Sequence, residues 1–500
     1  GCDGNPFTHI ITVNPIPVVT ASPLSPQTVC SGSSTQSINL LSSVTPSTFF
    51  WTAATTDPVT GYPGSGITST IGSFNPVNSD DTVGVITFTI TATASGCQSA
   101  PVTYLVKVNP RPMMTVTPKS KIICSNTNTA IALTSNVANT TYTWSSTVVS
   151  GNISGNTNGS GTPISNTLLN TGTSYGTVQY AITPEANSCP GDTIHYQVYV
   201  QPVPTVTATP STQTICSGSS SQAINLSSPV IGIGDVTFSW TTVTNPVAGL
   251  TGYTPAANGN TILGSCITST LTIPGTVTYT ITPSIAGCTG TMNTAAITVN
   301  PAPTVNNTSL TQSVCSGSPS SPVTLTSNLD PNVTFSWTAS ATAGLTGYAP
   351  SGTNTIPVQT IDNNTTMNGT VTYHILPTST FPGISCQGNP ADYIIVVKPV
   401  PEITATPSSQ EICSESSTNI LLSSNIAGTT FSWTYSVLSG SVNGGSSGSG
   451  SAITQVLNNT GTTNALVRYS VTSSANGCLG QTLNVEITVK PKPTVTASPV

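Results

Sequence analysis

The amino-acid sequence predicts an all-β protein, built as a tandem array of five β-sandwich domains that form an elongated rod. Three observations support this prediction. Tryptophan recurs at spacings of 93 to 97 residues, short segments alternate apolar and hydroxyl side chains, and turn-forming residues (42 Gly and 40 Pro) are frequent. Short alternating segments separated by turn residues are typical of strands, and no segment has a convincing helical period with caps.

Charge is scarce, and its scarcity excludes several classes of function. Only 4% of the 500 residues are charged, against about 25% in an ordinary soluble domain. Eight Lys and Arg in the whole chain cannot form the basic surface that nucleic-acid binding requires. Coiled coils are excluded for the same reason, and no apolar run approaches the roughly 20 residues of a membrane-spanning helix.

The repeat sets the expected domain organisation. Trp51, Trp144, Trp240, Trp337 and Trp433 mark one unit each, and a Val-x-Pro-x-Pro segment ends every unit. A period of this length is too long for a solenoid, so each unit is expected to fold by itself. The predicted ranges are 1–13 (end of a preceding repeat), 14–109, 110–201, 202–300, 301–398, 399–490, and 491–500 (start of a following repeat).

Alternation within a unit locates the strands and the core. Val277, Tyr279 and Ile281 alternate with threonines, as expected for a strand with one buried face. The same pattern recurs in every unit, which suggests about seven strands each. The five tryptophans stand two residues after an aromatic residue on such a strand, so we expect them in the cores; the alternative, stacking on a sugar, would require exposed aromatic rings.

Cysteine spacing predicts disulfides. Ten of the 12 cysteines follow one rule, in which each unit has one early Cys before Ser and one late Cys in a turn. The expected pairs lie within units: Cys30–Cys97, Cys124–Cys189, Cys216–Cys288, Cys315–Cys386 and Cys413–Cys478. Each would stabilise its domain by about 4 kcal/mol in the chain-entropy model. Zinc is the alternative, but the chain has no CxxC. Disulfides indicate an oxidising compartment outside the cytoplasm.

Two cysteines stand outside this rule. Cys2 occupies the position of a late cysteine without its early partner, so we expect repeats to continue beyond this chain in both directions. Cys266 has no counterpart in the other units. A buried free thiol is the favoured interpretation for Cys266, and an intermolecular bridge is the alternative.

Residues for catalysis or metal binding are sparse. His9, His195 and His374 occupy unrelated positions in the repeat, and the nearest carboxylates, Asp80 and Asp81, are adjacent in one loop. A Ser-His-Asp arrangement would need partners that the units do not supply. We therefore predict no catalytic residue, no cofactor and no metal site. Thr82 and Thr193 follow Asp and precede an apolar residue, which makes them candidate O-glycosylation sites.

The repeated motifs resemble a known family. The cycle Val-x-Pro-x-Pro, Ile-Cys-Ser-Gly, Thr-Phe-Ser-Trp and Gly-Thr-Val-Thr-Tyr is similar to the PKD-like, Ig-like repeats of giant secreted adhesins of gliding Bacteroidetes, of the SprB type. The resemblance covers nearly the whole chain, although Thr follows Trp51 and Trp240 where true PKD domains have Asp. It implies export by type IX secretion, outer-membrane anchoring through other parts of the protein, and association with motility machinery.

We therefore expect a non-enzymatic stalk of an extracellular adhesin that attaches to external surfaces or polysaccharide and serves gliding motility. Rigid proline links and five domains of roughly 35–40 Å each would give a rod of roughly 200 Å. Two alternatives stay open. The domains could be spacer or carbohydrate-binding modules of a secreted polysaccharide-degrading enzyme, or the subunit of a filament or sheath.

Overall fold

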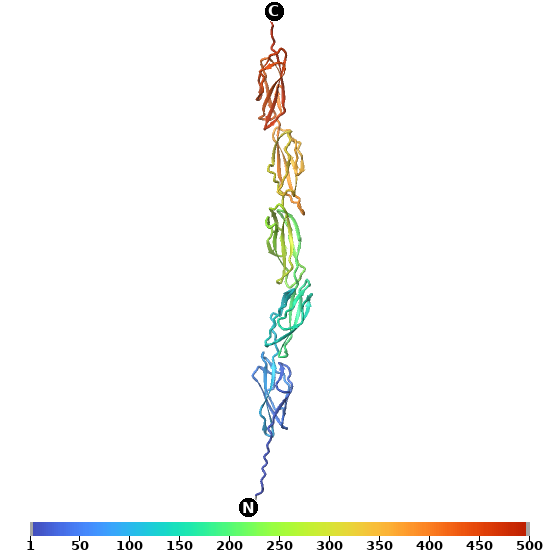
Figure 1. The fold of residues 1–500 in the computed structure, drawn as a ribbon, viewed down its shortest axis with the longest axis vertical. Helices are drawn as coiled ribbons and strands as arrows, with labels where there is room; N and C mark the ends of the chain where they lie inside the picture. The colour runs from blue at the N-terminus through green and yellow to red at the C-terminus, as the bar shows by residue number, and fades with distance from the viewer. Residues whose placement is uncertain (1–3, 497–500) are drawn as a thin grey trace, which may run out of the picture.

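Five β-sandwich domains follow one another along a rod in the computed structural model, which describes residues 4–496 (Figure 1). The predicted all-β fold is confirmed, since these residues contain strands and no helix. The domains are numbered 1 to 5 from the N-terminus. Residues 4–496 therefore contain no helix that could span a membrane.

The larger sheet of each domain has the same strand order. In domain 1 it runs β2-β11-β9-β4-β6, and a short strand pairs with β9 at one end. The first two strands are parallel and the others are antiparallel. The strands of these sheets are, in domain 1, β2 (Gln27–Cys30), β11 (Val102–Asn109), β9 (Gly84–Ala94), β4 (Thr48–Thr55), β6 (Ser65–Gly66) and β10 (Cys97–Gln98); in domain 2, β12 (Ser120–Cys124), β20 (Ile194–Gln201), β18 (Gly176–Ala186), β14 (Thr141–Ser150), β16 (Gly159–Ser160) and β19 (Cys189–Pro190); in domain 3, β22 (Thr212–Cys216), β32 (Asn293–Asn300), β30 (Gly275–Ile285), β25 (Thr237–Asn245), β27 (Ala256–Asn258) and β31 (Cys288–Thr289); in domain 4, β33 (Thr311–Cys315), β41 (Ala391–Lys398), β40 (Gly369–Ser379), β35 (Val333–Ala341) and β37 (Ser351–Thr353); and in domain 5, β43 (Ser409–Cys413), β53 (Leu483–Lys490), β51 (Ala465–Ala475), β46 (Thr430–Ser439), β48 (Gly448–Ser449) and β52 (Cys478–Leu479).

Shorter strands form the opposite layer. In domain 1 they make the order β1-β3-β7 and the pair β5-β8, and the other domains vary this arrangement. These strands are β1 (Val19–Ser22), β3 (Ile38–Ser42), β7 (Thr70–Ile71), β5 (Val59–Thr60) and β8 (Val77–Asn78); β13 (Thr127–Asn128), β17 (Thr167–Asn170) and β15 (Ile153–Ser154); β21 (Thr207–Thr209), β24 (Ile224–Ser227), β28 (Thr261–Ile262), β23 (Ser219–Ser220), β29 (Cys266–Ser269) and β26 (Leu250–Thr251); β34 (Val323–Thr324), β38 (Thr355–Ile356), β36 (Leu345–Thr346) and β39 (Asp362–Asn363); and β42 (Ile403–Thr406), β45 (Ile420–Ser424), β49 (Ala452–Ile453), β44 (Ser416–Ser417), β50 (Val456–Asn459) and β47 (Val442–Asn443).

Each domain has its own core, made by the alternation of its long strands. Along β30 every second residue is buried, which places Val277, Tyr279 and Ile281 inside and the threonines between them further out. Four tryptophans are buried in these cores, and Trp144 is half-buried. The five core clusters are separate, and each draws its residues from one domain.

A glycine on the edge strand makes room for the indole in four domains. Trp337 pairs with Gly352 on β37, where an added Cβ would lie 2.3 Å from the indole ring. Domain 3 has Ala257 opposite Trp240 instead. The indole therefore covers the edge strand, and a side chain larger than alanine at that position would displace it.

Candidate functional site: the domain junctions

Four disulfides cross the junctions between domains, so the predicted pairing within units is wrong. The bonds are Cys30–Cys189, Cys124–Cys288, Cys216–Cys386 and Cys315–Cys478. The early cysteine of each of the first four domains is bonded to the late cysteine of the next domain. None of the expected pairs Cys30–Cys97, Cys124–Cys189, Cys216–Cys288, Cys315–Cys386 and Cys413–Cys478 forms, and Cys97 and Cys413 are free.

The register of the strands explains why the two cysteines of one domain do not pair. Cys124 ends β12 and pairs with Gln201 at the C-terminal end of β20, whereas Cys189 follows β18 at the opposite end of the domain. A strand of about eleven residues separates them by roughly 36 Å, but a disulfide needs Cα atoms within about 7 Å. Cys124 meets Cys288 of the next domain instead, with a Cα–Cα distance of 5.4 Å.

Polar side chains reinforce the disulfides at the first three junctions. The last residue of the domain's final strand contacts carbonyls of the next domain: Asn109 Nδ2 donates to Asn187 O (3.0 Å), and Asn300 Nδ2 donates to Ile384 O (2.9 Å). These carbonyls lie in the turn before the late cysteine. At the first junction Arg111 Nε also donates to Ser31 O (2.9 Å). Each such bond fixes the orientation of one domain end against the other.

The second junction has an additional contact. Gln201 is fully buried, its amide donates to Ile233 O, and its Oε1 accepts from Ile233 N, both at 3.2 Å. Ile231 N donates to Thr173 O (2.8 Å), and Tyr175 N donates to Ile231 O (3.0 Å). The loop around Ile231, which belongs to domain 3, therefore extends the backbone pairing of domain 2.

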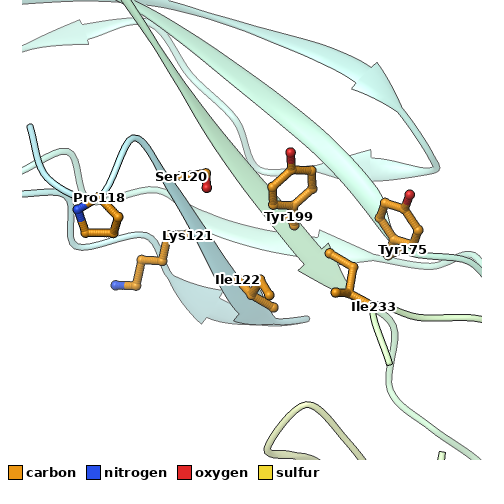
Figure 2. A pocket seen from close by; sticks show the side chains of 7 residues that line it. All are labelled: Pro118, Ser120, Lys121, Ile122, Tyr175, Tyr199 and Ile233. Carbon is orange, nitrogen blue, oxygen red and sulfur yellow. The ribbon is translucent and has the colours of Figure 1, made fainter. Parts of the chain in front are cut away.

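An open cavity of about 610 Å³ lies beside this second junction. Figure 2 shows Tyr175 and Tyr199 next to each other, with Ile122 and Ile233 beside them. The two rings meet edge to face at a centroid distance of 6.3 Å. Tyr199 donates its hydroxyl to Gln197 Oε1 (2.7 Å). Tyr175 is exposed and Tyr199 is half-buried. The pair is the feature of the second junction that a sugar-binding interpretation could use, and alternation alone did not reveal it.

His374 has two side-chain partners, Ser340 and Asp392, that were not predicted from the sequence. On the exposed face of domain 4, Ser340 Oγ lies 3.1 Å from His374 Nε2, and His374 Nδ1 lies 2.7 Å from Asp392 Oδ1. His374 and Asp392 pair across β40 and β41. The register of β35, β40 and β41 brings these residues together. That register cannot be read from the sequence.

These distances match those of a catalytic triad, but the surroundings do not supply the rest of an acyl-transfer site. Such a site needs amide donors aimed at the developing oxyanion. Near Ser340, Ala339 N donates to Pro350 O (2.7 Å) and Thr342 N donates to Thr370 O (2.9 Å). The side chains of His374 and Asp392 are 49% and 53% exposed. Water therefore competes for the charge that a triad must stabilise.

The remaining candidate residues lie apart from one another. His9 and His195 are exposed, and Asp80 accepts from Asp81 N (2.9 Å) and the Thr82 hydroxyl (3.2 Å), so its carboxylate organises its own loop. No cluster of three His, Cys, Asp or Glu that could hold a metal occurs within residues 4–496. The candidate O-glycosylation sites Thr82 and Thr193 are exposed.

The expected burial of Cys266 is also wrong. It is free, as favoured, but it is exposed at the start of β29 and not buried. Its Sγ lies 3.2 Å from Gly218 O. Cys2 lies outside the described residues.

Burial raises the pKa of tyrosines in the cores. Desolvation is the main cause for Tyr373, whose pKa rises to about 12 although its hydrogen bond to Gln359 acts in the opposite direction. Desolvation by burial also raises the pKa of Tyr180 and the pKa of Tyr469. These phenols are fully buried, so they belong to the cores and not to a surface site.

The chain has low overall similarity to several solved structures. The human desmocollin-1 ectodomain has 10% identity over 95% of this chain and 99% of its own, with a TM-score of 0.27. Immunoglobulin domains 1–5 of Sidekick-1 have 11% identity over 95% and 99%, with a TM-score of 0.20. Likeness at this level says nothing about function. No curated protein matches the chain.

A family model for the PKD-like domain matches the chain five times, at residues 27–112, 121–204, 213–303, 312–401 and 410–493. These five ranges cover most of the sequence, and each contains one late cysteine and one tryptophan. The chain therefore belongs to the PKD-like domain family and consists of five copies of that domain in tandem.

Proposed function

We propose that this chain is a non-enzymatic stalk of a large secreted cell-surface adhesin that serves surface attachment and gliding motility. The observation that carries the proposal is the disulfide across each of the four junctions. Such bonds fix one domain to the next, which is what a stalk needs in order to hold a binding region away from a cell. They also require the oxidising conditions found outside the cytoplasm.

The surface of the rod fits repeated weak contacts. Threonine and serine occupy the outer face of the long strands, and only 4% of the residues are charged. Hydroxyl groups bind through hydrogen bonds that salt screens little. Many identical weak contacts along five domains gain strength by multivalency. External surfaces and polysaccharides are the proposed partners, and the family resemblance adds cell-surface secretion and motility machinery, with anchoring to the outer membrane through other parts of the protein.

Labelling on intact producing cells tests this proposal. Gold-labelled antibodies against domains 1 and 5 are expected to bind without permeabilisation and to lie at different distances from the cell envelope. Fab fragments against the same domains are expected to reduce attachment to glass and the movement of cells over it. Labelling confined to lysed cells, or attachment and movement unchanged at saturating Fab, would contradict the proposal.

The absence of enzymatic activity is tested at Ser340. A fluorophosphonate probe reacts with activated serine nucleophiles. We expect no labelling of the folded chain, because the amides of Ala339 and Thr342 beside Ser340 already donate to Pro350 O and Thr370 O. The control is the Ser340→Ala variant. Labelling that disappears in this variant would show an activated serine and would overturn the non-enzymatic assignment.

A second candidate function is glycan binding at the second junction, favoured by the tyrosine pair beside the 610 Å³ cavity. Retention of the chain on insoluble polysaccharides that falls at least tenfold in the Tyr175→Ala/Tyr199→Ala variant would support carbohydrate-binding modules. The matched control is Tyr62→Ala, which changes a half-buried tyrosine in domain 1. Equal retention of all three proteins would exclude this cavity as the site.

A further inference from the structure

The junction disulfides connect the chain in an order different from the backbone. Domain 2 is bonded to domain 1 through Cys189 and to domain 3 through Cys124. In domains 2 to 5 each early cysteine follows the late cysteine of the preceding domain by 27 positions, as Cys216 follows Cys189 and Cys315 follows Cys288. Each such segment contains the last strand of one domain, the proline-rich link and the first strand of the larger sheet in the next domain.

We propose that these segments and bonds form two continuous covalent rails that carry tension along the rod and leave the rest of each domain outside the path of the force. The first rail consists of residues 19–30, 189–216 and 386–413, joined by Cys30–Cys189 and Cys216–Cys386. The second rail consists of residues 97–124, 288–315 and 478–490, joined by Cys124–Cys288 and Cys315–Cys478.

The two rails lie side by side in every domain. In domain 3 the first rail contributes β22 and the second contributes β32, and these strands pair in parallel from Thr212–Ala296 to Cys216–Asn300. The same parallel pairing occurs in the other four domains. Neighbouring domains exchange roles, because the last strand of one domain and the first strand of the next belong to the same rail.

Little slack remains in a rail. A segment of 27 residues spans at most about 95 Å when fully extended. It already crosses two domains, and a long strand of eleven residues makes each domain roughly 36 Å long. The links add to the distance crossed. Tension therefore meets covalent bonds after a small extension.

The segments between the early and the late cysteine of one domain are then protected. They are residues 31–96, 125–188, 217–287, 316–385 and 414–477, which contain the tryptophans and most of the core. Force that follows a rail does not pull on the hydrogen bonds between β4 and β9 or on their equivalents. A domain under tension keeps its fold because its central strands are not stretched.

Two free thiols, Cys97 and Cys413, mark ends of the rails in this chain. Cys97 Sγ lies 3.8 Å from Asn14 O, and the bonded Cys386 Sγ lies 3.8 Å from Asn300 O. Asn300 is the register partner of Cys216, so Asn14 stands beside Cys97 as Asn300 stands beside Cys386. Cys413 ends the first rail in domain 5 and is exposed, which makes it a chemical handle.

Single-molecule stretching between the N-terminus and Cys413 tests the first rail. The protein carries Cys2→Ala, Cys97→Ala and Cys266→Ala, so that a maleimide handle attaches to Cys413. The oxidised chain is expected to reach a limit near 300 Å without unfolding steps, since about 86 residues, 1–30, 189–216 and 386–413, lie on this path. After reduction the limit should be roughly 1,400 Å, reached through stepwise unfolding, because all 413 residues up to Cys413 then bear the force.

Two double variants separate the rails. In Cys216→Ala/Cys386→Ala the first rail is broken at the third junction, and the limit of the oxidised chain should rise about twofold, to roughly 670 Å. The shortest covalent path then runs through residues 1–30, 124–189, 288–315 and 413–478, about 190 residues. In Cys315→Ala/Cys478→Ala the number of disulfides is also reduced by one, but only the second rail is broken, so the limit should stay near that of the parent. This second variant is the matched control.

Each alternative gives a different length. Disulfides within domains would bond Cys413 to Cys478 and, because Cys97 is replaced, leave Cys30 as the free thiol. The handle would then attach at Cys30, and the limit would be near 100 Å. An equal increase in both double variants would show that the two rails are not separate. Either result would overturn the proposal. The rails can be tested in this way whether or not the rod belongs to an adhesin.

Discussion

The interior of a domain and the junction between two domains are held by different physical means. The interior relies on apolar burial: in domain 4, Trp337 and Tyr373 lie in a separate core with ring centroids 5.3 Å apart, and no disulfide connects two residues of the same domain within residues 4–496. The junction relies on a covalent bond and a few hydrogen bonds. Folding and connection are therefore separate, and each can be removed without first removing the other.

The four junctions show that the disulfide is their common element. Asn109 and Arg111, Gln201 with the loop around Ile231, and Asn300 support the first three junctions in different ways. At the fourth junction Lys398 takes the equivalent position, and no hydrogen bond joins domains 4 and 5 beyond the link within the described part of the chain. The noncovalent contacts differ from junction to junction, whereas all four junctions have the disulfide.

Removing a core indole should have the largest effect on a domain. Trp337 is 3% exposed and donates to Thr355 O at 3.1 Å. Trp337→Ala is expected to destabilise domain 4 by about 3–5 kcal/mol, since it leaves a cavity and an unpaired carbonyl. Calorimetry of the oxidised array should show one transition moved to lower temperature. Ser340→Ala, on the exposed face of the same strand, is the control, and an equal shift in both variants would contradict the assigned core.

Reduction should destabilise the array but not an isolated domain. A disulfide stabilises mainly by restricting the unfolded chain, typically by about 2–4 kcal/mol. An isolated domain 4, residues 301–400, contains no bonded pair, because Cys315 and Cys386 have their partners in other domains. Urea unfolding with and without reductant measures the difference. Equal sensitivity of the isolated domain would restore the pairing within units.

A buried asparagine should contribute less than the indole. Asn363 Nδ2 donates to Met367 O and Val397 O, both at 2.8 Å, and ties β39 to the last strand of the domain. Asn363→Ala leaves both carbonyls without this donor and should cost domain 4 about 1–3 kcal/mol. Asn364→Ala, at an exposed neighbouring position, should stay within about 0.5 kcal/mol in urea unfolding. A larger loss at Asn364 would refute the role of the buried amide.

Alkaline pH should lower the stability of domain 4, and this effect should be the smallest of the four predicted here. The pKa of Tyr373 is raised to about 12 because burial disfavours the phenolate, so its contribution is complete below pH 10 and is lost as the pH rises from 10 to about 12. Tyr373→Phe should flatten this decline for domain 4. Domain 1 has Phe88 at the equivalent position and serves as the internal comparison. Absorbance of the phenolate and unfolding at each pH are the measurements.

The sequence predicted the strands because their cause is local. Alternating residues such as Val277, Tyr279 and Ile281 face one side of a strand whatever the strand pairs with, and the regular spacing of the tryptophans indicated five separate cores. The disulfide pattern could not be predicted in the same way. It depends on which end of the sandwich each cysteine reaches, and that follows from the pairing of Cys124 with Gln201.

The same distinction explains the candidate site residues. The sequence showed that His374 has no counterpart in the other repeats, but its contacts with Ser340 and Asp392 depend on the register of three strands. Tyr175 and Tyr199 meet because a turn and the last strand of domain 2 approach the loop of domain 3. Positions far apart in the chain become neighbours only after the strands have paired.

The sequence by itself determined the composition of the rod: all-β domains, one core in each, and cysteines at two fixed places per repeat. Only the tertiary structure decided that these cysteines join one domain to the next. The physical reason is distance, because a disulfide requires Cα atoms about 5.5 Å apart. Two cysteines at opposite ends of one sandwich cannot meet, while the ends of adjacent sandwiches lie in contact.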